Sequence, residues 1–186
     1  RIFLAINPPA EVRRRIWDAT VALREAHRGV AWVAEPKIHL TLKFLGVVPE
    51  AAVDPLSDAM VEVARTHAPP LVHLQTVGAF PDLRRPRVVW LGVDPEPRLE
   101  LLHHDVEVAC ERIGHELDGR PYRPHLTLGR VREAGTADVI KALRMAARRV
   151  RFSDEFHVQS IDVMQSVPGS AGSTYTVLAS APMKGS

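Results

Sequence analysis

The chain has 186 residues, of which 46% are hydrophobic and 25% charged, the proportions of an ordinary globular protein. Its apolar runs are too short to span a membrane, and residues 1–7 are typical of a strand rather than a signal peptide. The single Cys110, which we expect to be a small core side chain, cannot form an internal disulfide and so favours a cytoplasmic protein, and the net charge of +2 by itself indicates little. We expect no membrane contact.

Strands and helices alternate in the predicted first half. Residues 1–7 form a strand that Pro8 ends, and the apolar spacing from Ala10 to His27 predicts a single helix. The other elements expected here are strands at Val30–Val33 and Ile38–Leu45 and a helix over Val53–Val63.

The second half is expected to begin with a long hairpin. Its strands are Leu71–Phe80 and Val88–Val93. The elements expected after it are a helix over Leu99–Leu117, a strand His125–Val131, a helix capped by Thr136 and ending near Arg149, and strands at Phe152–Gln165 and Ser173–Ala179. Hairpins dominate and no regular alternation of a parallel sheet is present, so we expect an α+β fold with antiparallel sheets.

The tetrapeptide His-Leu-Thr-Leu occurs twice, beginning at His39 and at His125. Chance would produce such a pair on the order of once in 10⁵ chains. Residues two apart in a strand share a face, so His39 lies beside Thr41 and Lys43, and His125 beside Thr127, with the leucines opposite. If the two strands lie side by side about a pseudo-twofold axis, both polar pairs line one cleft.

These residue types suit phosphodiester chemistry. Histidine, with an ordinary pKa of about 6.5, serves as base or acid near neutral pH, and cleavage needs one of each. The two threonine hydroxyls can donate hydrogen bonds to the phosphate oxygens and fix the phosphorus between the imidazoles. No metal or other cofactor is required for this chemistry.

Other site types lack their signatures. No H-E-x-x-H or C-x-x-C spacing marks a zinc site, and the remaining histidines form no ligand pattern; His103 and His104 are assigned to a helix surface. No G-x-S-x-G elbow or P-loop is present, which argues against a serine hydrolase and a nucleotide-powered enzyme. A metal phosphodiesterase stays open as an alternative.

Arginines gather at two places in the sequence. One group is Arg84, Arg85 and Arg87, and the other comprises Arg144, Arg148, Arg149 and Arg151. Such groups attract polyanions, including RNA, but also occur as a simple solvated surface.

At the two tetrapeptides the chain resembles the 2H phosphoesterase superfamily, which is defined by two His-x-Thr-x motifs. It is similar in particular to the bacterial and archaeal RNA 2′,3′-cyclic phosphodiesterases, historically called 2′-5′ RNA ligases. The segments that carry this resemblance are RIFLAI, WVAEPKIHLTLKFLG, VGAFPDLRRPRVVWLGV and RPYRPHLTLGRVR.

The resemblance implies a bilobal fold in which residues 1–186 form one domain, with two antiparallel sheets flanking a central groove and helices outside. It implies hydrolysis of an RNA terminal 2′,3′-cyclic phosphate to a 2′-phosphate without metal, and in some members a weak, reversible 2′-5′ ligation. His39 and His125 would be the acid–base pair, and Thr41 and Thr127 would hold the phosphate.

Two further positions match the family. Arg130 follows the second motif and could neutralise phosphate charge, although strand parity places it opposite His125 unless the strand bulges at Gly129. Phe80 could stack on the terminal base, with core packing as the alternative.

Two other functions stay open: hydrolysis of another small cyclic phosphate, such as ADP-ribose 1″,2″-cyclic phosphate or a cyclic nucleotide, and non-catalytic binding of RNA ends or nucleotides. The expected partners are RNA 3′ ends or small nucleotide cyclic phosphates, and the expected state is a monomer.

Overall fold

The computed structural model describes residues 1–185, in which nine strands form one curled antiparallel sheet. The strands are β1 (Ile2–Ile6), β2 (Val30–Trp32), β3 (Leu40–Gly46), β4 (Leu71–Phe80), β5 (Val88–Val93), β6 (His125–Val131), β7 (Ser153–His157), β8 (Ser160–Val167) and β9 (Thr174–Pro182). The helices are α1 (Ala10–Ala19), α2 (Val21–Ala26), α3 (Val53–Thr66), α4 (Pro97–Arg112) and α5 (Ala137–Arg149), with short 3-10 helices η1 (Glu35–Lys37) and η2 (Glu50–Ala52).

The sheet consists of two halves that meet at one residue pair. The strand order is β7-β4-β5-β6-β3-β1-β8-β9, and β2 adds to β6. The two motif strands are paired only through Leu40 and Leu126, which hold the same position in the two tetrapeptides. A pseudo-twofold axis therefore passes through this pair and relates β3-β1-β8-β9 to β6-β5-β4-β7.

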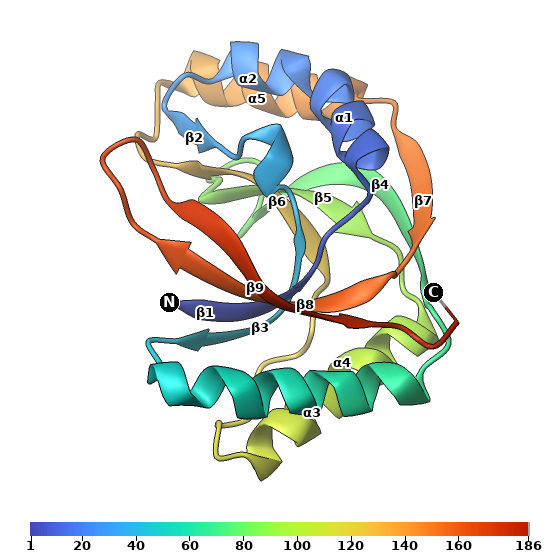
Figure 1. Ribbon diagram of the computed structural model, residues 1–186. Coiled ribbons are helices and arrows are strands. Elements are labelled where there is room, and N and C mark those ends of the chain that lie inside the picture. Colours follow the sequence, from blue (N-terminus) through green and yellow to red (C-terminus); the bar gives the residue numbers. More distant parts are fainter. Residues whose placement is uncertain (186) are drawn as a thin grey trace.

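The helices cover the outside of the two halves, as Figure 1 shows. Below the strands, α3 packs on β8, β9 and α4, whereas α1, α2 and α5 lie above them, with α5 against α2 and β4. The helix that follows each motif strand, α3 after β3 and α5 after β6, lies on its own half. The α+β fold with antiparallel strands and outer helices, predicted from the sequence, is confirmed. The two sheets that were predicted are two halves of one sheet, because β3 and β6 pair at Leu40 and Leu126.

The leucines of the two tetrapeptides anchor the motif strands in the core. Leu40 and Leu126 are completely buried, and Leu42 and Leu128 are 3% and 4% exposed. Burial of such a side chain stabilises the fold by about 2 kcal/mol. The apolar anchor predicted for each motif is therefore present.

The single helix predicted from Ala10 to His27 is wrong, because the chain breaks at Thr20 into α1 and α2. The Thr20 hydroxyl donates to the Ile16 carbonyl at 2.8 Å, and Thr20 itself has φ −107° and ψ 14°. A threonine hydroxyl that bonds a carbonyl four residues earlier favours a bend.

The strand predicted over Phe152–Gln165 is also two strands, which lie in different halves. β7 pairs with β4, and β8 pairs with β1, so the chain crosses between halves at Val158, whose N–H donates to the Pro70 carbonyl. The helix expected to reach Leu117 ends at Arg112, since Gly114 adopts a positive φ of 92°.

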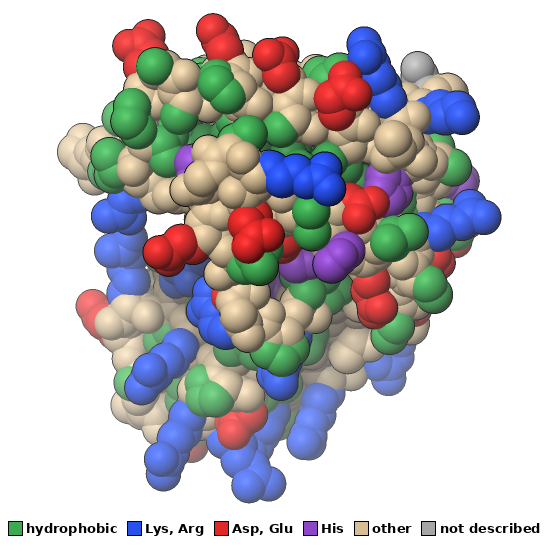
Figure 2. Space-filling view, turned by 90° about the horizontal axis from the view of Figure 1, so that it is seen from below, with side chains coloured by type: hydrophobic (Ala, Val, Ile, Leu, Met, Phe, Trp, Pro, Cys, Tyr) green, Lys and Arg blue, Asp and Glu red, His purple; other side chains and the backbone are tan. Residues whose placement is uncertain are grey.

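Charges are unevenly distributed over the surface. In the view of Figure 2, lysine and arginine side chains gather toward the lower edge, while most of the visible acidic side chains lie above them. No helix within residues 1–185 has both the length and the apolar character needed to cross a membrane.

Candidate active site

A β-bulge follows the threonine in each motif strand. In β3, Thr41 pairs with Ala5 and Lys43 with Leu4, so that Leu42 is an extra residue. In β6, Thr127 pairs with Trp90 and Gly129 with Val89, so that Leu128 is the extra residue. One extra residue reverses the parity of everything that follows it in the strand.

The bulge in β3 moves Lys43 away from the face of Thr41, and the face predicted for Lys43 is wrong. Its Nζ is buried behind the strand, 2.7 Å from Glu107 Oε2 and 2.7 Å from the Glu116 carbonyl oxygen. Phe44 takes its place on the groove side, where it pairs with Phe3 and is 66% exposed.

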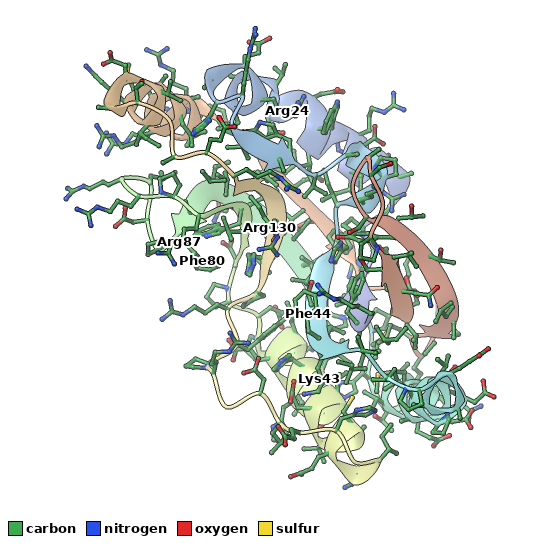
Figure 3. All side chains as sticks on the ribbon, turned by 90° about the vertical axis from the view of Figure 1, so that its left-hand side faces the viewer. Arg24, Lys43, Phe44, Phe80, Arg87 and Arg130 are labelled. Atoms are coloured by element: carbon green, nitrogen blue, oxygen red, sulfur yellow. The ribbon has the colours of Figure 1, made fainter. Side chains whose placement is uncertain are left out.

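The bulge in β6 brings Arg130 onto the face of His125. Arg130 pairs with Val88, and because Val88, Trp90 and Gly92 alternate along β5, their partners in β6 share one face. Arg130, Thr127 and His125 therefore lie on the groove side, and in Figure 3 Arg130 lies near Phe80 on one side of the groove, with Phe44 on the other.

Equivalent hydrogen bonds fix the two imidazoles. His39 Nδ1 lies 2.8 Å from the Lys37 carbonyl oxygen, and His125 Nδ1 lies 2.7 Å from the Arg123 carbonyl oxygen. A carbonyl oxygen only accepts, so Nδ1 carries the proton in both rings, and Nε2 is the acceptor in the neutral imidazole. His39 Nε2 lies 3.1 Å from the Thr41 hydroxyl, which donates to it.

The pKa of each motif histidine is lowered from the ordinary value. For His39 the main cause is burial, opposed by the hydrogen bond to the Lys37 carbonyl, with Arg130 and His125 lowering the pKa further. For His125 burial is again the main cause, opposed by the bond to the Arg123 carbonyl, and Arg130 again lowers the pKa. Both rings are therefore neutral near pH 7 in the free protein.

Aromatic rings hold each imidazole in place. The Phe80 ring meets that of His125 edge-on, with 4.9 Å between centroids. Phe3 and Tyr175 contact His39, at centroid distances of 5.0 and 5.5 Å. Each imidazole thus packs against an aromatic side chain from its own half of the sheet, and this packing restricts its rotation.

An open cavity of about 540 Å³ adjoins both motifs. Its lining includes Thr41 from the first motif, His125 from the second, and Phe80 and Arg130. The register at Leu40 and Leu126 continues to place Thr41 opposite His125 and His39 opposite Thr127 across the two strands. Four of the six site residues predicted from the sequence, Thr41, Phe80, His125 and Arg130, thus line this cavity, whereas His39 and Thr127 are not among its lining residues.

Two residues that the sequence analysis did not assign to the site, Tyr122 and His103, also line this cavity. Tyr122 donates from its hydroxyl to the Thr41 carbonyl at 3.3 Å, and its ring stacks on His103 with 3.7 Å between centroids. The surface position expected for His103 is therefore wrong, whereas His104 is exposed. Tyr122 lies three residues before His125, and this closeness to the second motif in the sequence is the feature that could have marked it as a site residue.

Within residues 1–185, no group of three or more histidine, cysteine, aspartate or glutamate side chains is placed to hold a metal ion.

The chain is similar in sequence to proteins that are named RNA 2′,3′-cyclic phosphodiesterases. An RNA 2′,3′-cyclic phosphodiesterase of Archaeoglobus fulgidus is 32% identical over 143 residues, which are 76% of this chain and 79% of that protein. One from Methanothermobacter thermautotrophicus is 28% identical over 176 residues, 95% of each chain.

Solved structures share the fold. The crystal structure of TT0787 of Thermus thermophilus has a TM-score of 0.82 and 29% identity, covering 100% of this chain and 98% of that chain. E. coli LigT complexed with 3′-AMP has a TM-score of 0.72 and 28% identity, covering 98% and 97% of the two chains. The family model described as the 2′-5′ RNA ligase superfamily matches residues 8–169. With this match over most of its length and a residue of each His-x-Thr motif lining one cavity, the chain belongs to the 2′-5′ RNA ligase superfamily of 2H phosphoesterases.

Proposed function

We propose that this protein hydrolyses the terminal 2′,3′-cyclic phosphate of RNA to a 2′-phosphate, by metal-independent acid–base catalysis. The observation that carries the proposal is the pseudo-twofold pair of imidazoles, His39 and His125, each anchored through Nδ1. Nε2 is then the nitrogen that exchanges a proton, and in His39 it accepts a hydrogen bond from the Thr41 hydroxyl. The names of the relatives in Archaeoglobus and Methanothermobacter support the substrate.

In the proposed reaction, Nε2 of one histidine takes a proton from water as the water oxygen bonds to phosphorus. The bond between phosphorus and the 3′-oxygen breaks, and the other histidine donates its proton to that oxygen. The 2′-phosphate is the product. The proposal leaves open which ring takes which role, and the negative charge of a bound phosphate favours the protonated form that the acid needs.

Thr41, Thr127 and Arg130 are proposed to hold the phosphate. A hydroxyl or guanidinium directed at a non-bridging oxygen stabilises the charge that develops there, and a charge-assisted bond from Arg130 contributes about 2 kcal/mol. Phe80, beside His125, is proposed to stack on the terminal base, which contributes about 1–3 kcal/mol.

The same site would support weak 2′-5′ ligation. If a 5′-hydroxyl of a second RNA attacks the cyclic phosphorus in place of water, the same 3′-oxygen leaves and a 2′-5′ phosphodiester forms. One phosphodiester is exchanged for another without an energy source, so the reaction is reversible.

The test is incubation of an RNA hexamer ending in 2′,3′-cyclic phosphate with the protein in excess EDTA, followed by phosphorus NMR of the product. We expect undiminished hydrolysis and a 2′-phosphate. A 3′-phosphate product would contradict the proposed regiochemistry, and loss of activity in EDTA would favour a metal phosphodiesterase.

A second candidate is hydrolysis of a small cyclic phosphate that is not an RNA end. It is favoured by the structures of E. coli LigT complexed with ATP and NADP⁺, which are nucleotides rather than RNA. A higher kcat/KM for ADP-ribose 1″,2″-cyclic phosphate or a cyclic nucleotide than for the hexamer would select this function. Tight binding of the hexamer without turnover would instead indicate a non-catalytic module.

A further inference from the structure

A second cavity, of about 430 Å³, lies next to the one that holds the motif residues, and four arginines line it. Arg84, Arg85 and Arg87 come from the loop between β4 and β5, and Arg132 directly follows β6. All four side chains are exposed, and none of them forms an ion pair with any of residues 1–185.

The two cavities lie at the same end of the β5–β6 pair. Val88 and Arg130, which pair across these strands, line the first cavity, and their chain neighbours Arg87 and Val131 line the second. The Val131 N–H donates to the Arg87 carbonyl at 2.9 Å, so the pairing continues past the strand end. Figure 3 shows Arg87 close to Phe80 on the same side as Arg130.

The second cavity is electrostatically suited to anions. No aspartate or glutamate is among its lining residues. The nearby Asp82 has a structural task in the loop, because its Oδ1 accepts from the backbone N–H groups of Arg84 and Arg85 at 2.6 and 3.1 Å. Gly135, two residues before α5, and Ile140 in the first turn of α5 also border the cavity.

We propose that this arginine cavity binds the phosphates of the nucleotides on the 5′ side of the terminal cyclic phosphate. The proposal rests on the proposed function, because it assumes that an RNA end occupies the first cavity. Arg130 and Arg132 are two residues apart, about 6–7 Å along a strand, a separation comparable with that of neighbouring phosphates in a single strand. The enzyme would then prefer single-stranded RNA ends to mononucleotides, without reading their sequence.

The test compares two substrates: a mononucleoside 2′,3′-cyclic phosphate, which reaches only the first cavity, and a hexamer with the same 3′ end. We expect Arg87→Ala/Arg132→Ala to raise KM for the hexamer roughly tenfold while kcat/KM for the mononucleotide stays within about twofold. The salt dependence of hexamer binding gives a second readout. Its slope on logarithmic axes should fall by about 1.4, since each phosphate contact on single-stranded RNA contributes about 0.7.

The matched control is Arg148→Ala/Arg149→Ala, which removes the same charge from the last turn of α5, about 16 Å along the helix from its start. This control should leave the hexamer KM and the salt slope unchanged. Equal effects of the two double variants, or equal losses on both substrates, would overturn the proposal.

Binding of a hexamer ending in 2′-phosphate, measured by fluorescence anisotropy, tests the arginine cavity independently of hydrolysis. If wild-type protein hydrolyses no cyclic phosphate, the proposed function fails, but the anisotropy still reports on the arginine cavity. Equal hexamer affinity of wild type and Arg87→Ala/Arg132→Ala would refute the cavity alone. A hexamer affinity no higher than that of an acidic peptide of equal charge would also refute it as an RNA site.

Discussion

Replacement of Lys43 by methionine tests whether the bulge in β3 places this lysine behind the groove. Its Nζ contacts the Glu107 carboxylate and the Glu116 carbonyl oxygen, and the Lys43 and Glu107 side chains are only 5% and 8% exposed. Without Lys43, Glu107 Oε2 keeps a single bond, from the Asp118 N–H at 3.0 Å, and Glu107 Oε1 has no hydrogen-bond partner.

The expected cost follows from this geometry. Removal of one partner from a buried ion pair costs about 3–5 kcal/mol, because the other charge stays buried and uncompensated. We therefore expect Lys43→Met to lower the free energy of unfolding by about 4 kcal/mol. At 2–4 °C per kcal/mol for a chain of this size, the melting temperature should fall by about 8–16 °C.

Urea unfolding followed by circular dichroism measures this change. The control Lys141→Met, at an exposed position of α5, should change the unfolding free energy by less than about 0.5 kcal/mol. Lys43→Met/Glu107→Leu should recover most of the loss, since no unpaired charge remains. A change under about 1 kcal/mol, accompanied by a loss of turnover above about tenfold in folded protein, would refute the assignment and return Lys43 to the groove.

Three further outcomes are expected. Arg130→Gln should shift the pH profile of kcat/KM to higher pH, because the positive charge of Arg130 lowers the pKa of both motif histidines. The same variant should reduce kcat/KM roughly 10–100-fold. An unshifted pH profile would contradict the placement of Arg130. Gly129→Ala should destabilise the fold by about 1–3 kcal/mol, because a Cβ there would lie 2.5 Å from a side-chain atom of Val30 and 2.7 Å from one of Trp32. An unchanged midpoint of urea unfolding would contradict this packing. Cys110 should resist iodoacetamide at pH 8 until the chain unfolds, because burial raises the pKa of its thiol to about 11; rapid labelling of folded protein, detected by mass spectrometry, would contradict its burial.

The sequence predicted the parts of the fold that depend on local pattern. Alternation along β3 and β6 identified the polar pairs and their leucine anchors, and hairpin spacing identified the antiparallel sheet. The sequence analysis expected the two motif strands to lie side by side, and in the structure they pair at Leu40 and Leu126. These inferences succeeded because two-residue periodicity is a local property of the chain.

The parts that the sequence did not predict depend on single residues and on distant contacts. One extra residue, Leu42 or Leu128, reversed the faces of Lys43 and Arg130. Gly129 had suggested a bulge as one alternative in the second motif strand, but no residue suggested one in the first. The crossing of the chain between halves at Val158 follows from its pairing with a segment far away in sequence. The role of Tyr122 under Thr41 likewise exists only in three dimensions.

The most direct test of the central claim is the turnover of His39→Ala, His125→Ala and the double variant on an RNA hexamer ending in 2′,3′-cyclic phosphate. We expect each single variant to lose about 10³-fold or more in kcat, and the double variant to lose little beyond that, because the two rings act as one acid–base unit. The control His104→Ala, on the exposed face of α4, should keep full activity. Full activity in His125→Ala would contradict acid–base catalysis by the two imidazoles.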